Sequence, residues 1–579
     1  MSSPASSRSA ARWVLPVAGL LLLLGVWQCL ASGPLRDSNL PGLHSTFRAL
    51  RDVVGEDVFW TSVLQTLRQA LVGFALSVAV ALPLGLYVGT SPFGQHATKV
   101  LIEVLKPIPA IVVLPLAVLQ LGTSDRLAVF LVMFTLVPML TVTVAAGARD
   151  ADPVMLDAAR SYGLGRVART WLVVMPNAVP FIATGLRVGA SFALILAVLA
   201  GLYGGAPGLG HDLDIYRQAG LLDSSFAYVL VLGVLGIALN AMLSAGERKV
   251  LFWHESVRKD DAGSSTAGVG PTATGRKPGA SHARLWAVQD TLEGAVRRVT
   301  ARPAVRRLGR LLTPRRPPVS DAVWRWVLRL ITVLVPVLVV AVWWVRSANS
   351  ENPFFPPLSE TVESFRAVWL HEDAFDNVVP SLRNLGLGFG LGTAAGIVAG
   401  AVIGQVRWLF WMLSPLISFF RSIPSIAYLP ILIAVIGFTS PMRVTAISLA
   451  AFFPVLIAAI DGVRGIDETL LDATRSYQVP SVIAFFWVRL PAAVPRIFVG
   501  AELGLAAALI VMVASELIGT SQGIGAQVLL AQQTFQFADM WAGILLLAAI
   551  GIMTNLLFRA VRSRLLGWYD GARAASRAQ

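Results

Sequence analysis

Two short stretches of this chain decide its interpretation: Asp157-Ala-Ala-Arg-Ser-Tyr-Gly163 and Asp472-Ala-Thr-Arg-Ser-Tyr-Gln478, which begin 315 positions apart. In each, small residues follow an acidic one, which suits a short helix that lies flat against a partner. A glycine such as Gly163 can end that helix in a left-handed turn. Prolines that follow both stretches redirect the chain. We therefore expect two equivalent surface loops, near residues 148–176 and 462–491.

The spacing of 315 residues recurs along the whole chain. It aligns Lys106-Pro-Ile-Pro-Ala110 with Arg421-Ser-Ile-Pro-Ser425, and Gly73-Phe74 with Gly388-Phe389. The further matches are Pro176 with Pro491, Pro180 with Pro495, and Gly185 with Gly500. Matches over so many segments indicate a duplicated unit.

The composition places this duplicated unit in a membrane. Of the 579 residues, 55% are hydrophobic and 14% are charged, whereas soluble domains carry about 25% charged residues. Apolar segments near the roughly 20 residues that span a bilayer recur through the chain. They lie near residues 13–31, 63–88, 100–121, 126–147, 178–200, 226–246, 323–346, 378–403, 412–436, 443–460, 492–513 and 541–561.

The sequence thus predicts an all-α integral membrane protein of about twelve transmembrane helices. We expect two tandem repeats of six helices, residues 1–246 and 323–579, related by an axis along the membrane normal. Residues 247–322 would form a cytoplasmic linker, because Ala262–Ala280 is rich in Gly, Ser, Thr and Pro. The arginine-rich run behind it is interpreted either as a solvated tether or as a contact for anionic lipid or a regulator.

Basic residues orient the predicted helices. They concentrate in the two loops and the C-terminal tail, so the rule that positive loops face the cytoplasm puts both termini there. Trp13–Ala31, which follows Arg8 and Arg12, is interpreted as a retained first helix rather than a signal peptide. The basic residues used are Arg149, Arg160, Arg166, Arg169, Arg464, Arg475, Arg489, Arg562, Arg564, Arg573 and Arg577.

The sequence lacks the residues that several classes of function need. The sole cysteine, Cys29, cannot form an intrachain disulfide, and ligands for zinc or thiol chemistry are missing. The net charge of +14 is typical of cytoplasmic loops and does not require nucleic acid. His211, Asp212 and Asp214 cluster in a predicted exterior loop, for which solvation is favoured over metal binding, so no metal site is expected.

The paired loops resemble the EAA loop of permeases in binding-protein-dependent ATP-binding-cassette importers. Asp157 and Asp472 match the acidic position, and Gly163 matches the glycine. The second loop departs from this pattern, because Thr474 stands where the pattern has a small residue and Gln478 stands where it has glycine. The remaining small positions are Ala158, Ala159 and Ala473.

A second resemblance narrows the branch. Phe420-Arg-Ser-Ile-Pro-Ser-Ile-Ala-Tyr-Leu-Pro430 is similar to segments of the nitrate, sulfonate and taurine permeases, and Leu105–Pro115 is its first-half version. The resemblance implies a bacterial inner-membrane importer of a small polar or anionic organic solute. It further implies two cytoplasmic ATPase subunits docked on the two loops, and an exterior solute-binding lipoprotein.

The chain contains no Walker A motif, G-x-x-x-x-G-K-[ST]. We therefore expect ATP and magnesium to be used by partner subunits, with no cofactor bound by this chain, no nucleic-acid partner and membrane lipid as its surroundings. A secondary transporter or channel is the alternative, although it would not need paired docking loops. A membrane enzyme is disfavoured, since no Ser/His/Asp or His/Glu arrangement lies on adjacent apolar helices.

Five residues are candidates for the translocation path. Pro109 and Pro424 either kink their helices or contact the solute, because broken helices line many transport pathways. Arg187 and Glu502 are repeat counterparts inside predicted helices, so they either pair across the repeat axis or extend to the interface. Glu516, whose counterpart is Gly201, lies either at an interface or on the path.

Overall fold

The computed structural model describes residues 5–33, 39–250, 320–370, 375–518, 522–569 and 571. In these ranges the chain is built of helices joined by short loops, with no β-strand. The all-α class predicted from the sequence is therefore confirmed. The linker prediction falls almost wholly on residues 251–319, which lie outside the described ranges.

Among the described residues, ten helices are long and apolar enough to cross a membrane. Five belong to the first repeat and five to the second, and each corresponds to a span predicted from hydrophobicity. The first five are α1 (Ala5–Ser32), α3 (Asp57–Thr90), α6 (Asp125–Arg149), α9 (Met175–Gly204) and α11 (Leu222–Val250). Their counterparts are α15 (Asp321–Ser347), α17 (Phe375–Gln405), α20 (Ser440–Arg464), α23 (Leu490–Leu517) and α25 (Phe537–Leu565).

The third predicted span of each repeat is a broken helix rather than a continuous one. Backbone dihedrals become extended at Pro109 and at Pro424. Proline lacks the donor that an α-helix needs, and it disfavours helical geometry in the residue before it. The axis in the second half bends by 87° at this break. The pieces are α4 (Pro92–Leu105), η1 (Ala110–Val112) and α5 (Leu114–Leu121), then α18 (Arg407–Ser422), η4 (Ser425–Ala427) and α19 (Tyr428–Ile436).

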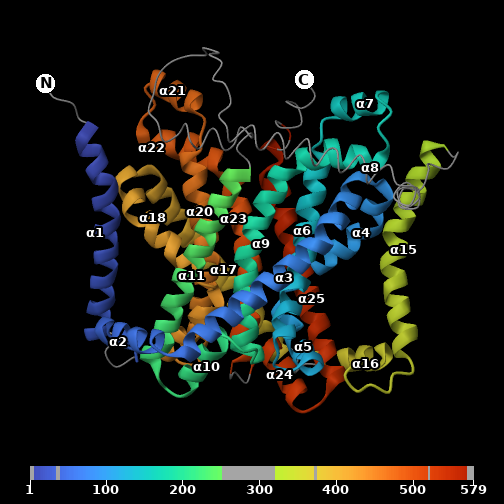
Figure 1. The fold of residues 1–579 in the computed structure, drawn as a ribbon, viewed down its shortest axis with the longest axis horizontal. Coiled ribbons are helices and arrows are strands. Elements are labelled where there is room, and N and C mark those ends of the chain that lie inside the picture. The colour runs from blue at the N-terminus through green and yellow to red at the C-terminus, as the bar shows by residue number, and fades with distance from the viewer. Residues whose placement is uncertain are drawn as a thin grey trace.

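Shorter helices cover the two ends of the molecule (Figure 1). The upper end carries α7 (Pro153–Ser161), α8 (Arg166–Arg169), α21 (Glu468–Ser476) and α22 (Ser481–Ala484). The lower end carries α2 (Leu43–Val54), α10 (Leu209–Gln218), α16 (Leu358–Trp369) and α24 (Ile524–Gln533). Two π-helical turns, η2 (Thr170–Val174) and η5 (Phe485–Arg489), lead into α9 and α23. Nearly all bounds repeat at the 315-residue spacing.

Glycines let the central helices of each repeat approach closely. A Cβ added to Gly85 of α3 would lie 2.6 Å from Val144 of α6, and one added to Gly400 of α17 would lie 2.5 Å from Ala459 of α20. Small residues allow this contact in membranes, where van der Waals packing rather than hydrophobic burial associates helices. Each repeat thus contains a bundle of three helices that pack side by side. These are α3, α6 and α9 in the first repeat and α17, α20 and α23 in the second.

The two repeats interlock instead of standing apart. The first helix of each repeat packs on the other repeat, α1 on α18 and α15 on α4, so these helices flank the molecule on opposite sides (Figure 1). The last helices also cross over. A Cβ on Gly236 of α11 would lie 2.5 Å from the Ser422 carbonyl oxygen, and one on Gly551 of α25 would lie 2.8 Å from that of Pro107. These contacts repeat at the spacing of 315 residues found in the sequence, and each joins one repeat to the other.

Candidate functional site

Helices α7 and α21 extend from the same end of the molecule, one from each repeat (Figure 1). Asp152 and Asp467 cap them, because their carboxylates accept hydrogen bonds from the amides of Val154 (2.8 Å) and Thr469 (3.0 Å). The bonds from Thr469 stabilise the ionised carboxylate and lower the pKa of Asp467. A carboxylate at this position also complements the helix dipole. Both loops therefore begin with the same cap.

The two helices also end in the same way. Gly163 adopts a left-handed conformation with φ of 74°, and Gln478 does so with φ of 50°. The amide of Leu164 donates to the Ala159 carbonyl, and the amide of Val479 donates to that of Thr474, both at 3.0 Å. This is the Schellman pattern of helix termination. The departure from glycine in the second loop therefore leaves the turn unchanged.

The acidic positions of the loops carry local ion pairs. Asp157 accepts from Arg160 at 2.6 Å, and Asp472 accepts from Arg475 at 3.0 Å. All four side chains are exposed, so these pairs add little stability. The sequence identified the two arginines as orienting charges but not as partners of the aspartates.

The small residues of the loops fall into two groups. Ala159 is buried against the body of the protein, whereas Ala158 and Ala473 are exposed. Thr474 replaces an alanine without leaving its hydroxyl unpaired, since that group donates to the Leu471 carbonyl at 2.7 Å. The substitution therefore preserves the helix.

Exposed apolar side chains surround both loop helices. Tyr162 and Tyr477, which occupy equivalent positions, are 86% and 83% exposed. Exposed apolar groups gathered at one place mark interaction sites. The sequence contained this signal, because both tyrosines recur at the repeat spacing. Further exposed members are Val154, Met155, Trp171, Leu470, Val482, Ile483, Phe486 and Trp487.

Pro109 and Pro424 lie at the boundary between the repeats. Both are buried, and their carbonyls accept the first bonds of η1 and η4. Those turns contact the central helix of the opposite repeat, η1 with α23 and η4 with α9. The kinking role of the prolines is confirmed, and contact with the solute stays a prediction.

Arg187 and Glu502 lie on α9 and α23. The Glu502 carboxylate accepts from Nη1 of Arg562 on α25 at 3.4 Å, with both side chains partly exposed. Arg187 lies within electrostatic range of Arg421 on α18. In this conformation Glu502 therefore has a partner from its own repeat, and pairing with Arg187 stays a prediction.

Glu516 is buried rather than placed at a solvated interface, with 1% of the residue exposed. Its carboxylate accepts from the Ser381 hydroxyl at 2.6 Å and from the Gly525 amide at 2.9 Å, so it anchors the start of α24. At the equivalent Gly201 a Cβ would lie 2.8 Å from the His211 amide nitrogen. The first repeat therefore closes the same junction by backbone packing.

His211, Asp212 and Asp214 lie on helix α10, which connects α9 and α11, so the prediction of an irregular loop is wrong here, and the exterior placement of this connection stays a prediction. The Asp212 carboxylate accepts from the Tyr228 hydroxyl at 3.3 Å, and Asp214 pairs with Arg217. Within the described ranges, no group of three or more His, Cys, Asp or Glu residues is arranged to hold a metal ion.

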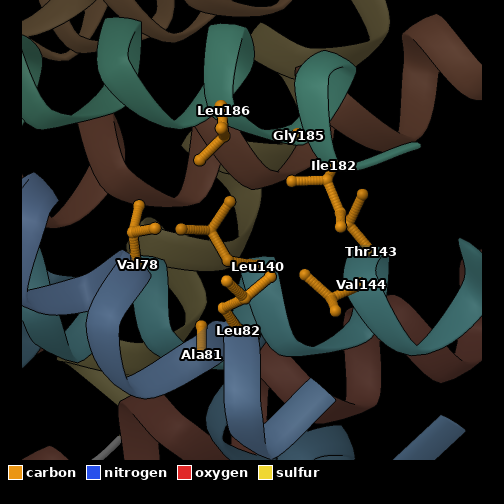
Figure 2. A pocket seen from close by; sticks show the side chains of 9 residues that line it. All are labelled: Val78, Ala81, Leu82, Leu140, Thr143, Val144, Ile182, Gly185 and Leu186. Carbon is orange, nitrogen blue, oxygen red and sulfur yellow. The ribbon is translucent and has the colours of Figure 1, made fainter. Parts of the chain in front are cut away.

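A small void lies between α3, α6 and α9 (Figure 2). Its volume of about 10 Å³ is at the limit for one water molecule, and its walls are almost entirely aliphatic. It is a packing defect of the first repeat and offers no site for a solute.

A far larger cavity, of about 720 Å³, lies where α9 and α10 of the first repeat face α19, α23 and α24 of the second. Of these helices, α10 and α24 lie at the end opposite α7 and α21 (Figure 1). A neighbouring cavity of about 350 Å³ shares Tyr203, Leu517, Leu529 and Gln533 with it. We name the two together the vestibule. The sequence did not reveal it, because its walls come from six separate segments.

Comparison with known proteins agrees with this architecture. Residues 81–251 and 392–567 each match the family described as binding-protein-dependent transport system inner membrane component. The two matches occupy one region of each repeat and together cover more than half of the chain.

Individual relatives are similar to one repeat's length of the chain. The taurine transport system permease protein TauC of Escherichia coli is 29% identical over 250 residues, 42% of this chain and 91% of TauC. An aliphatic sulfonates transport permease protein, SsuC, of Bacillus subtilis is 31% identical over 250 residues, covering 41% of this chain and 88% of SsuC. The nitrate import permease protein NrtB of Synechocystis is 27% identical over 259 residues, 43% of this chain and 93% of NrtB.

A relative of nearly full length thus corresponds to about two fifths of this chain, as expected if two permease units are fused. The helical architecture, the interlocked repeats and the paired surface loops are those of a transport subunit rather than an enzyme. The chain belongs to the family of binding-protein-dependent transport system inner membrane components, and it is a fused double permease subunit of an ATP-binding-cassette importer.

Proposed function

We propose that this chain carries a small anionic or polar organic solute, of the sulfonate, nitrate or taurine kind, into a bacterial cell across the inner membrane. The names of the relatives support this class of solute. The charge and polarity of the vestibule support it further, because arginine and amide donors suit an oxyanion.

Two cytoplasmic ATPase subunits would dock on α7 and α21, one on each loop. The observation that carries this assignment is the pair of equivalent, exposed tyrosines, Tyr162 and Tyr477, on equally capped helices. The docked subunits would use ATP and magnesium, and this chain would bind no cofactor. The coupling residues would be those of the two loops, Asp157, Ala158, Ala159, Gly163, Asp472, Ala473 and Gln478.

The opposite end of the molecule would receive an exterior solute-binding lipoprotein. This orientation is supported by the arginines beside α7 and α21, which favour the cytoplasm for that end and for both termini. The exterior partner would then meet the end that carries α2, α10, α16 and α24.

A docked subunit would act on the path through one connected series of helices. Helix α7 contacts α8 and η2, and η2 leads into α9, which contacts η4 of the other repeat. Displacement of α7 would therefore reach the Pro424 break in the opposite half. In the second loop the route would begin at α22, which contacts η5, and continue through α23 to η1. Each ATPase would thus move both halves.

The docking assignment is tested by removing the two aromatic side chains. The full chain is purified from membranes in which it is produced with ATPase and binding-protein subunits, and solute-stimulated ATP hydrolysis is measured. Tyr162→Ala and Tyr477→Ala should each lower hydrolysis severalfold, because exposed aromatic anchors carry much of an interface's free energy. The double variant should lose stimulation.

Tyr569→Ala is the matched control, since Tyr569 is also exposed but follows the end of α25. It should leave hydrolysis unchanged. Full stimulation and an unaltered amount of bound ATPase in the double variant would disprove docking at these loops.

A further inference from the structure

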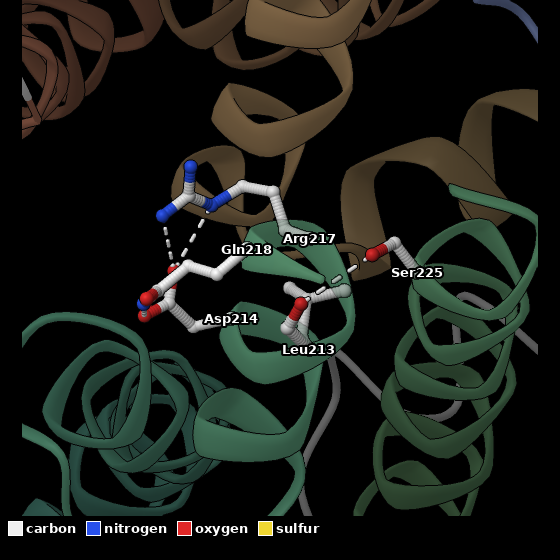
Figure 3. Close-up of polar contacts among 5 residues, drawn as sticks. All are labelled: Leu213, Asp214, Arg217, Gln218 and Ser225. Atoms are coloured by element: carbon white, nitrogen blue, oxygen red, sulfur yellow. Dashed lines mark hydrogen bonds and ion pairs between the residues drawn. The ribbon is translucent and has the colours of Figure 1, made fainter. Parts of the chain in front are cut away.

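The vestibule contains one fixed cation. Arg217 of α10 donates from Nε (3.0 Å) and Nη2 (2.7 Å) to one carboxylate oxygen of Asp214. Gln218 donates to the other oxygen at 2.5 Å, so both oxygens of Asp214 accept hydrogen bonds from its own helix (Figure 3). Within the described part of the chain, Nη1 of Arg217 has no acceptor, and Figure 3 shows it directed away from Asp214. Asp214 therefore holds the guanidinium in place while leaving a donor available.

A second donor in the vestibule lacks an acceptor. The hydroxyl of Tyr203 is buried and has no hydrogen-bond partner among the described residues. Tyr203 lines both cavities and lies within electrostatic range of Arg217. A buried hydroxyl without a partner is destabilising, and most such groups are satisfied by water or by a ligand. In this conformation the Tyr203 hydroxyl is enclosed beside the cavity, so it donates to an acceptor there only when the side chain turns toward it.

These groups are confined to one repeat. The equivalents of Tyr203, Asp214 and Arg217 at the 315-residue spacing are Ile518, Leu529 and Gln532. The second repeat thus faces the same space with aliphatic side chains and amides, together with Pro430 and Phe438. One wall can bind an oxyanion and the other can contact carbon atoms, so the vestibule is polarised across the repeat axis.

We propose that the vestibule is a contact site for a small organic oxyanion, a sulfonate or a carboxylate. Nη1 of Arg217 and the Tyr203 hydroxyl donate to its oxygens, and Leu517, Phe438 and Pro430 contact its carbon part. The proposal rests on the proposed import of anions and names the residues that select them. Asp214 offsets much of the positive charge, which keeps the site weak enough for the solute to move on.

The test uses the full chain in membrane vesicles with Cys29→Ser and Gln533→Cys. Gln533 lines both cavities. The rate of modification by anionic 2-sulfonatoethyl methanethiosulfonate is divided by the rate for its cationic trimethylammonium analogue. We expect this ratio to exceed, by roughly two- to threefold, that of the neighbouring Thr534→Cys, which is exposed but lines neither cavity, because Asp214 offsets much of the charge of Arg217. Arg217→Gln should abolish the difference, and Arg217→Lys should retain most of it.

Ligand binding is measured as protection of the cysteine from an uncharged reagent, methyl methanethiosulfonate. Methanesulfonate should slow modification of Gln533→Cys, and Arg217→Gln and Tyr203→Phe should each weaken this protection. Chloride at equal ionic strength should not protect. Equal protection by chloride, or a ratio insensitive to Arg217, would overturn the oxyanion site.

The labelling needs neither ATPase nor binding protein. If it fails while Tyr162 and Tyr477 still govern hydrolysis, the oxyanion site is wrong and the import function stands. If labelling succeeds but those tyrosines do not affect hydrolysis, docking at the loops is wrong and the oxyanion site stands.

Discussion

At the scale of single residues, the two loops show that one backbone turn accepts different side chains. Gly163 and Gln478 both take left-handed dihedrals, and the same backbone bonds close the helices before them. A residue with a Cβ destabilises this conformation by about 1 kcal/mol or more. The second loop therefore keeps the same turn although Gln478 disfavours the left-handed conformation. Gly163 adopts that conformation in the first loop without the same penalty.

This difference predicts opposite effects of exchanging the residues. Gln478→Gly should tighten the turn and slow hydrogen exchange of the Val479 amide roughly fivefold, for a gain of about 1 kcal/mol. Gly163→Ala should accelerate exchange of the Leu164 amide by a similar factor.

Gly165→Ala is the control for the first loop. An added Cβ meets nothing within 4 Å at either Gly163 or Gly165, but Gly163 alone of the two has a positive φ. Exchange that responds equally to both alanines would show that steric access, rather than dihedral strain, controls this turn.

At the scale of helices, glycine faces set how closely elements pack, both inside a repeat and across the boundary. Helix α11 reaches the break in the other repeat because Gly236 lets its backbone approach Ser422, and α25 repeats the contact through Gly551 and Pro107. Larger side chains at these points have no space to occupy. The contact of α11 and α25 with the opposite repeat therefore depends on two equivalent glycines.

We expect Gly236→Leu to weaken this contact and to lower the temperature at which the purified full chain loses its compact state. Overpacking of this kind typically destabilises by about 1–3 kcal/mol. Thermal unfolding in detergent, followed by size-exclusion chromatography, measures the change. Gly246→Leu on the same helix should be neutral, because an added Cβ there meets nothing within 4 Å. Equal losses in both variants would contradict a specific contact.

At the scale of the whole molecule, a symmetric scaffold carries asymmetric chemistry. The helices, breaks and loops follow the two-fold relation. The buried Glu516 is replaced by Gly201 in the other repeat, and Arg217 by Gln532. A single solute passing between two halves does not need the same group on both sides. Fusion into one chain allows the repeats to diverge at the vestibule while both loops keep the same turn.

The predicted pairing of Arg187 with Glu502 also involves both repeats. If the helices α9 and α23 move during transport, Glu502 can exchange Arg562 for Arg187. Uptake by membrane vesicles should then fall in Arg187→Ala and in Glu502→Ala, with a double variant less impaired than the two losses combined. Glu502 is partly exposed, so we expect a coupling of about 1 kcal/mol at most.

Arg562→Ala provides the comparison. Its ion pair with Glu502 is the one present in this conformation. Additive losses for Arg187 and Glu502, with coupling confined to Glu502 and Arg562, would show that the carboxylate stays with α25 throughout the cycle.

The sequence by itself determined the features that depend on neighbours along the chain or on the repeat. Hydrophobic runs located the membrane helices, Pro109 and Pro424 located their interruptions, and the 315-residue spacing established two equivalent units with paired loops. These features follow from local physics, since a proline breaks its own helix and an apolar run of sufficient length enters lipid wherever it occurs.

Only the tertiary structure decided which groups meet. Side chains that face lipid and side chains that face another helix are equally apolar, so hydrophobicity does not reveal how membrane helices pair. For that reason the exchange of α1 and α15 between the repeats, the anchoring of α24 by Glu516 and the partner of Glu502 emerged from the fold. The vestibule did so too, because Tyr203 and Gln533 are distant in sequence and come together where the two halves enclose a shared space.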